Sequence, residues 1–334
     1  MSTKLNITRS PEENPPGSDG TYAHRGSRGG TEMIAEEIRN RVRPALLERF
    51  MIIHSRVRDW MFKDLNGRIP ILVMHDTWDD PENQWMRDEK LRKRFARIIF
   101  VSHHQQATFN IGLGVPYHEG VVIQNAIVPI PAHKKPIDCV NMIYHTTPHR
   151  GLEILVPVFE KIHKEMLANV HLDVFSSFNA YNWPTRDEPY KALFERCRVH
   201  PAITYHGFQP NEIIREALQR SHIYAYPCIW PETSCISVIE AMSAGCRVVT
   251  SSLAALPETC AGMASMYTFS ENPNTSASRF CFSLAEAIQQ IGRAELVGHL
   301  EIQKMIFDTA YSWEARTNQW EGLLHALIRE KDAA

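Results

Sequence analysis

Short, uniformly apolar runs rich in β-branched residues recur along this 334-residue chain, and helical or turn segments separate them. Strands of this kind are typical of parallel sheets that helices cover on both faces. The first set of runs occupies residues 50–54, 69–74, 97–101 and 120–124. The second set occupies residues 140–144, 171–175, 203–206, 223–226 and 247–250. This alternation predicts an α/β protein with two successive sheet units.

A proline-rich segment separates the two sets of runs. Residues 128–136 hold three prolines in nine positions, and proline both fixes φ and interrupts a helix. The chain is also longer than one hydrophobic core usually serves. We therefore predict three parts. They are an N-terminal domain over residues 1–130, a second domain over residues 137–300, and a C-terminal helix over residues 301–334, whose amphipathic stretch at 312–331 packs across the domain junction.

The first domain is predicted to be the shorter of the two. Residues 1–28 are rich in proline, glycine and acidic residues and show no period, so we expect a loop or a loosely held arm. A first strand could come only from residues 4–8, far upstream of the helix that Gly29 and Gly30 introduce. The helices expected in the second domain cover residues 151–167, 211–220 and 234–244.

Composition and charge exclude several classes of function. A net charge of -2 gives no field for binding nucleic acid. No apolar run approaches the roughly 20 residues of a transmembrane helix, and the polar N-terminus lacks the apolar core of a signal peptide. The seven cysteines form no C-x-x-C pair, so neither zinc nor redox chemistry is indicated. We expect a cytoplasmic protein, which leaves room for peripheral contact with a membrane.

Two carboxylates flank the start of an apolar helix in the second domain. Glu232 precedes this helix, and Glu240 is the one charged residue between Thr233 and Cys246. We expect Thr233 or Ser234 as the N-cap and Gly245 just after the C-terminus. The free N–H groups of the first turn, near Cys235, favour a phosphate. An ordinary capped helix with a solvated Glu232 fits the same spacing.

Glu232 and Glu240, seven residues apart and followed by Ala-Met-Ser-Ala-Gly, resemble the E-x7-E motif of glycosyltransferase family 4, the retaining enzymes of the GT-B fold. The resemblance implies two Rossmann-like domains whose parallel sheets face each other across a cleft. It also implies that Glu232 contacts the transferred sugar and that Glu240 anchors the donor ribose. The residues that would hold the diphosphate through their backbone are Thr233, Ser234, Cys235 and Ile236. Thr-Ser-Cys stands here where the family usually has a glycine-containing loop.

Further matches to this family extend from about Arg28 to Trp320. Pro148-His-Arg-Gly-Leu152 is similar to the family's basic-Gly-Leu element, which makes Arg150 the cation for the leaving diphosphate. His145 stands where the family has a second basic residue. The remaining positions are Gly29 and Gly30 facing the diphosphate, His75 on the acceptor side, and Phe208 near the base pocket.

The resemblance implies a retaining, metal-independent glycosyltransferase. It would move a sugar from a UDP- or GDP-linked donor to a hydroxyl of a glycan or glycoconjugate, with no cofactor besides the nucleotide sugar. The sequence contains no Asp-x-Asp motif, and the adjacent His103 and His104 have no further ligands to form a metal site. Two alternatives stay open. One is a nucleotide-sugar epimerase or phosphorylase on the same fold, and the other is a non-catalytic nucleotide-sugar-binding protein. The turn at Gly26–Gly30 lacks the G-x-G-x-x-G spacing of a dehydrogenase.

Overall fold

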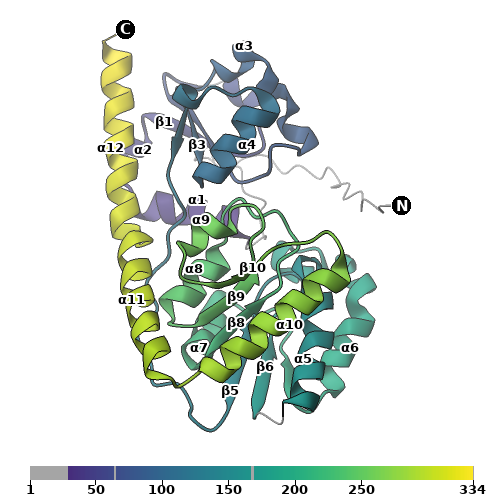
Figure 1. The fold of residues 1–334 in the computed structure, drawn as a ribbon. Helices are drawn as coiled ribbons and strands as arrows, with labels where there is room; N and C mark the ends of the chain where they lie inside the picture. Colours follow the sequence, from purple (N-terminus) through teal and green to yellow (C-terminus); the bar gives the residue numbers. More distant parts are fainter. Residues whose placement is uncertain (1–28, 64, 167–168, 334) are drawn as a thin grey trace.

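The computed structural model describes residues 29–63, 65–166 and 169–333, which form two stacked lobes (Figure 1). The predicted N-terminal arm and the short strand at residues 4–8 lie outside these described residues. Each lobe contains one parallel sheet, as the alternating apolar runs predict. None of the helices in the described part of the chain is long and apolar enough to span a membrane.

The first lobe contains a four-stranded parallel sheet with the order β1-β2-β3-β4. Its strands are β1 (Phe50–His54), β2 (Ile69–Met74), β3 (Arg97–Phe100) and β4 (Gly120–Val122). Its helices are α1 (Gly30–Arg41), α2 (Pro44–Leu47), α3 (Glu89–Arg92) and α4 (His103–Leu113), with 3-10 turns η1 (Asp59–Phe62), η2 (Pro81–Arg87) and η3 (Tyr117–Glu119).

Alternate residues of β1 enter different hydrophobic clusters on the two faces of this sheet. Phe50 and Ile52 join the cluster under α1 and the C-terminal helix, whereas Met51 and Ile53 join the cluster under α4. Both faces are therefore covered, and this explains why the strand is apolar at successive positions rather than at every second one.

The second lobe contains a six-stranded parallel sheet with the order β10-β9-β8-β5-β6-β7. Its strands are β5 (Val140–Tyr144), β6 (Val170–Val174), β7 (Ile203–Tyr205), β8 (Ile223–Tyr226), β9 (Arg247–Ser251) and β10 (Ser265–Tyr267). Its helices are α5 (Leu152–Glu165), α6 (Lys191–Val199), α7 (Asn211–Arg220), α8 (Ile236–Ser243), α9 (Leu256–Cys260) and α10 (Pro273–Gln290), with 3-10 turns η4 (Pro148–Arg150), η5 (Phe178–Tyr181) and η6 (Pro184–Tyr190).

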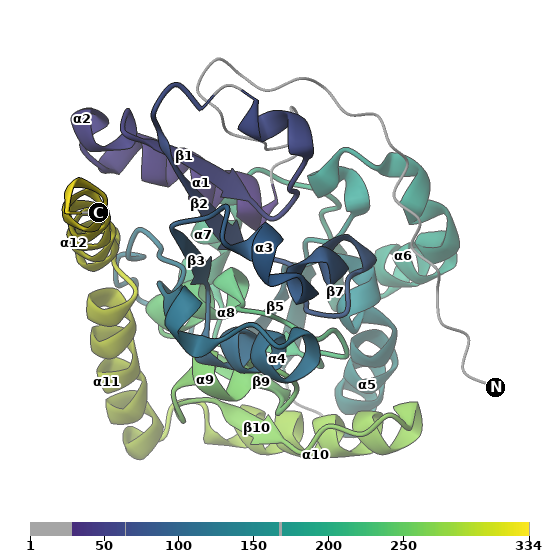
Figure 2. The ribbon, with the colours of Figure 1, turned by 90° about the horizontal axis from the view of Figure 1, so that it is seen from above.

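Two consecutive helices, rather than one, close the chain and cross between the lobes. Helix α11 (Ala294–Ala310) packs on α8 of the second lobe, and α12 (Trp313–Asp332) packs on α1 and α2 of the first. The predicted boundary at residue 300 therefore falls inside α11, and the crossing point lies at Tyr311 and Ser312. There Ile127 N–H donates to the Tyr311 carbonyl at 2.8 Å, so the linker and the crossing point run side by side. Figure 2 shows α11 and α12 along one side of the molecule and α5 and α6 on the other.

Candidate active site between the two lobes

The strand order of the second sheet reverses at β5 and β8. From β5 the chain builds outward through β6 and β7, and it then returns to β8 on the other side of β5. Ligands of open α/β sheets bind at the carboxyl ends of the strands at such a switch point. Arg150 follows β5 and Glu232 follows β8, so the topology brings together two residues that are 82 positions apart.

Gly151 allows the loops after β5 and β8 to touch. Its φ is +135°, and a Cβ there would lie 2.2 Å from the Pro227 carbonyl oxygen. Only glycine tolerates both the conformation and the close approach. Next to this contact the Ile229 N–H donates to the Arg150 carbonyl at 3.3 Å. The Arg-Gly-Leu element thus holds Arg150 against the loop that carries Glu232.

Arg150 and Glu232 form a buried ion pair. Arg150 Nη1 donates to Glu232 Oε1, and the Tyr226 phenol donates to the same oxygen at 2.5 Å. The side chains of Arg150 and Glu232 are only 18% and 6% exposed. Burial alone would lower the pKa of Arg150, but Glu232, Tyr181 and Tyr226 raise it well above its ordinary value. Arg150 therefore stays charged at any working pH.

Aromatic side chains that no sequence motif indicated surround this pair. The Tyr181 hydroxyl lies 3.4 Å from Arg150 Nη2, and the Trp230 ring lies 5.7 Å from the guanidinium carbon. His149 stacks on Phe178 and meets Trp230 edge to face. Trp230 is adjacent to the motif and could have been noticed, but no sequence signal connects Tyr181, in η5, with Arg150.

His145 does not supply the second positive charge of the site. The residue directly follows β5 and is buried, with its ring 4.8 Å from that of Tyr224. Burial lowers the pKa of His145 to about 3, against a smaller opposing effect of a hydrogen bond with the Ser237 backbone. The buried Nε2 has no hydrogen-bond partner within the protein. A neutral imidazole therefore lies near the start of α8.

The N-cap of helix α8 lies one residue after Ser234 and two after Thr233, the N-cap candidates predicted from the sequence. Its N-cap is Cys235, whose side chain makes no capping hydrogen bond, and its first residue is Ile236. Thr233 does not cap because its hydroxyl donates to the His75 carbonyl at 2.9 Å, and Ser234 lies half-buried in the connecting turn. Gly245, with φ of +68°, follows the helix at the predicted C-terminal position.

The glycines at the start of α1 lie against the second lobe. A Cβ on Gly29 would lie 2.7 Å from Tyr181 Cε1, and one on Gly30 would lie 3.2 Å from Ile236 Cδ1. The N-termini of α1 and α8 therefore meet between the lobes, and each leaves first-turn N–H groups without acceptors inside its own helix. Two helix N-termini at one place favour an anion.

Glu240 lies deeper in α8 and is held by α7. Its carboxylate accepts from Arg215 Nη1 at 2.9 Å and from Asn211 Nδ2 at 3.3 Å. Burial raises the pKa of Glu240, and Arg215 opposes this effect. The lone carboxylate expected on an apolar helix is thus buried and already partnered, a pairing that the sequence did not predict.

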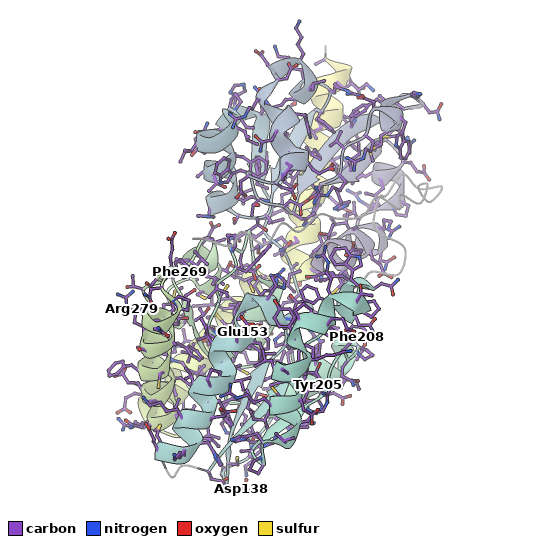
Figure 3. All side chains as sticks on the ribbon, turned by 90° about the vertical axis from the view of Figure 1, so that its right-hand side faces the viewer. Asp138, Glu153, Tyr205, Phe208, Phe269 and Arg279 are labelled. Atoms are coloured by element: carbon purple, nitrogen blue, oxygen red, sulfur yellow. The ribbon has the colours of Figure 1, made fainter. Side chains whose placement is uncertain are left out.

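His75 comes from the first lobe, directly after β2. The ring Nε2 of His75 lies 3.0 Å from His54 Nδ1, and the backbone N–H of His75 donates to Ser55 Oγ at 2.9 Å. Burial lowers the pKa of His75 to about 4, so the imidazole is neutral at physiological pH. Phe208 is half-buried in the loop between β7 and α7, near the end of the second lobe that faces the first (Figure 3).

Two other features lie outside this site. A cavity of about 500 Å³ opens at the amino ends of β5 and β9, between the linker and α11. This is the sheet edge opposite to Arg150 and Glu232, so the cavity is not part of the candidate active site. Within the described ranges, no group of three or more His, Cys, Asp or Glu side chains is arranged to hold a metal ion.

The fold and the site define a class of protein: two parallel sheets face each other, with a cation and a carboxylate at the switch point of the second. This is the architecture of GT-B glycosyltransferases, as predicted. Residues 129–277 match the family model "Glycosyl transferases group 1". The chain therefore carries a glycosyltransferase domain and is an enzyme of that class.

Several solved structures share this fold. A glycosyltransferase from Rickettsia africae ESF-5 has a TM-score of 0.67 and 12% identity, covering 83% of this chain and 76% of its own. Anabaena Alr3699/HepE in complex with UDP-glucose has a TM-score of 0.64 and 15% identity, covering 88% and 82%. Sucrose-phosphate synthase (tll1590) from Thermosynechococcus elongatus has a TM-score of 0.64 and 16% identity, covering 84% and 74%. A comparison with curated proteins found no match.

Proposed function

We propose that this chain is a retaining glycosyltransferase of family 4, which transfers a sugar from a nucleotide diphosphate to a hydroxyl acceptor without a metal ion. One observation carries the proposal. The Arg150–Glu232 pair is buried at the switch point of the second sheet, beside the N-terminus of α8. A buried guanidinium next to free helix N–H groups is suited to a diphosphate, and the adjacent carboxylate is suited to sugar hydroxyls.

In this proposal the donor binds chiefly to the second lobe. Its diphosphate accepts hydrogen bonds from Arg150 and from the first-turn N–H groups of α8, and the glycines of α1 close over it from the first lobe. Glu232 exchanges part of its pairing with Arg150 for hydroxyls of the transferred sugar. Glu240 orients the ribose, and Phe208 lies toward the base. A uridine donor is the first to test, because a structure of similar fold holds UDP-glucose.

During transfer the bond between the anomeric carbon and the β-phosphate oxygen breaks, and its electron pair leaves with the phosphate. The acceptor oxygen attacks the anomeric carbon from the same face and releases its proton to that phosphate oxygen. Arg150 stabilises the growing negative charge, which is why a fixed cation can serve where other enzymes use a metal ion. His145 is neutral and contributes no charge, so Arg150 carries this role among the predicted residues.

The acceptor approaches from the first lobe, where the neutral His75 can hydrogen-bond its hydroxyl. We propose a glycan or glycoconjugate as acceptor and the cytoplasm as location, with peripheral membrane contact where the acceptor is lipid-linked. All seven cysteines are free in the structure, in keeping with a reducing compartment.

A thermal-shift screen with UDP-, GDP-, ADP- and TDP-sugars, followed by product analysis, tests the proposal. One donor should raise the melting temperature by mass action, and Glu232→Ala should abolish transfer while the protein stays folded. A change in the donor without any acceptor would instead identify an epimerase. Donor binding without product over a wide acceptor panel would identify a binding protein, and stabilisation by no donor would refute the proposed function.

A further inference from the structure

Thr233, the residue directly after Glu232, connects the two lobes through two hydrogen bonds. Its hydroxyl donates to the His75 carbonyl at 2.9 Å, and its own carbonyl accepts from the Ser102 hydroxyl at 2.6 Å. His75 and Ser102 belong to the first lobe, whereas Thr233 belongs to the second. A single residue beside the proposed catalytic carboxylate is therefore fixed to the opposite lobe at two points.

Both partners in the first lobe are rigidly held. His75 follows β2 and Ser102 follows β3, and these strands are neighbours in the sheet. Ser102 also caps α4, since its Oγ accepts from the Gln105 N–H at 2.9 Å. Thr233 is therefore bonded to residues at the carboxyl ends of β2 and β3, and not to a flexible loop.

A second contact between the lobes reinforces this arrangement. The His103 and His104 N–H groups at the start of α4 each donate to the Glu258 carboxylate of α9 at 2.9 Å. Just before α9, the Ala255 N–H donates to the Glu232 carbonyl at 3.1 Å. The Glu232 backbone thus lies between Thr233, which bonds to the first lobe, and Ala255, which bonds to Glu232 within the second lobe.

We propose that Thr233 is a positioning residue that couples closure of the lobes to the placement of Glu232. This inference rests on the proposed function only for its catalytic consequence. In the closed arrangement Thr233 fixes the separation between His75 on the acceptor side and Glu232 on the donor side. When the lobes part, both of its hydrogen bonds break together, and the Glu232 backbone keeps only its bonds within the second lobe, with the Ala255 N–H and the Trp230 carbonyl.

Three variants isolate the Thr233 hydroxyl. Thr233→Val keeps the β-branched shape and removes the donor, whereas Thr233→Ser keeps the donor. Thr204→Val is the matched control, because the Thr204 hydroxyl lies 3.0 Å from His171 Nε2 within the second lobe alone. Hydrogen exchange of residues 101–106 and 232–238 measures the coupling without requiring activity, and UDP affinity, KM and kcat measure its consequence.

We expect Thr233→Val to speed exchange in both segments by about fivefold, the factor that corresponds to one net hydrogen bond. It should lower kcat by about the same factor while the donor KM and the UDP affinity stay within about twofold. Thr233→Ser should restore both properties, and Thr204→Val should change neither.

Two results would overturn the inference. One is unchanged exchange in the first-lobe segment of Thr233→Val. The other is weakened UDP binding with an unchanged kcat, which would make Thr233 a donor contact instead. If the unmodified protein transfers no sugar from any donor, the proposed function fails, but the exchange comparison still decides whether Thr233 couples the lobes.

Discussion

Replacing Glu232 by glutamine tests how much the buried ion pair between Arg150 and Glu232 stabilises the fold at the switch point. Glutamine keeps the size of the side chain and an oxygen that can accept from Tyr226 and Arg150, but it removes the negative charge. Arg150 is only 18% exposed, so water cannot replace that charge. Removing one partner of a buried pair costs about 3–5 kcal/mol, and the retained hydrogen bonds should reduce this to about 2–3 kcal/mol. At about 2–4 °C per kcal/mol, the melting temperature should fall by about 4–12 °C.

A double-mutant cycle separates the pair from other effects. Arg150→Met leaves the Glu232 carboxylate with Tyr226 as its partner, and the double variant leaves no buried charge at this position. The double variant should therefore lose less stability than the sum of the two single variants, by about 1–3 kcal/mol. UDP should raise the melting temperature of Glu232→Gln more than that of the unmodified protein, because the diphosphate supplies the missing negative charge.

Scanning calorimetry with and without UDP measures these effects, and an exposed pair provides the control. Glu188 lies 2.8 Å from Lys191, with side chains 63% and 69% exposed. Glu188→Gln should move the melting temperature by less than about 1 °C, because solvent screens such a pair. Strict additivity in the cycle, or a melting temperature of Glu232→Gln equal to that of the control, would refute the reasoning.

Three further predictions follow from burial and packing. Between pH 6.5 and 5 the unfolded chain protonates histidines that stay neutral when folded. Because His145 has a folded pKa of about 3, stability should fall by about 1 kcal/mol per pH unit on average over this interval for this residue alone, and His145→Gln should flatten the slope in urea unfolding by that amount. Gly29→Ala should cut turnover about tenfold, because its Cβ would lie 2.7 Å from Tyr181. Gly322 lies in α12, and a Cβ added there would meet no neighbouring group within 4 Å. Gly322→Ala should therefore leave turnover unchanged and add about 0.5–1 kcal/mol to the free energy of unfolding in calorimetry. Glu240→Gln should weaken UDP binding about tenfold by titration calorimetry, and an unchanged affinity would mean that Glu240 serves only its partners on α7.

Strands that are buried on both faces could be predicted from the sequence almost to the residue. The bounds of β1, β2, β5 and β8 are those expected from the apolar runs, because these strands are mostly apolar and contrast with the polar segments beside them. The short strand β10 at the edge of the second sheet escaped prediction. The helices α6 and α10 were also missed, because they contain no long uninterrupted apolar run, and α11 was merged with α12 into the one helix predicted over residues 301–334.

The sequence by itself determined which residue types stand beside the α8 helix, namely two carboxylates flanking its apolar start and an Arg-Gly turn after an earlier strand. Only the tertiary structure decided their partners. Glu232 pairs with Arg150 because β5 and β8 are neighbours in the sheet, and Glu240 pairs with Arg215 because α7 packs on α8. Likewise, burial keeps His145 neutral. The Thr233 hydroxyl donates to the His75 carbonyl of the first lobe and does not cap α8. Strand order, burial and lobe contact arise from packing between segments distant in the chain, and no local pattern of residues encodes them.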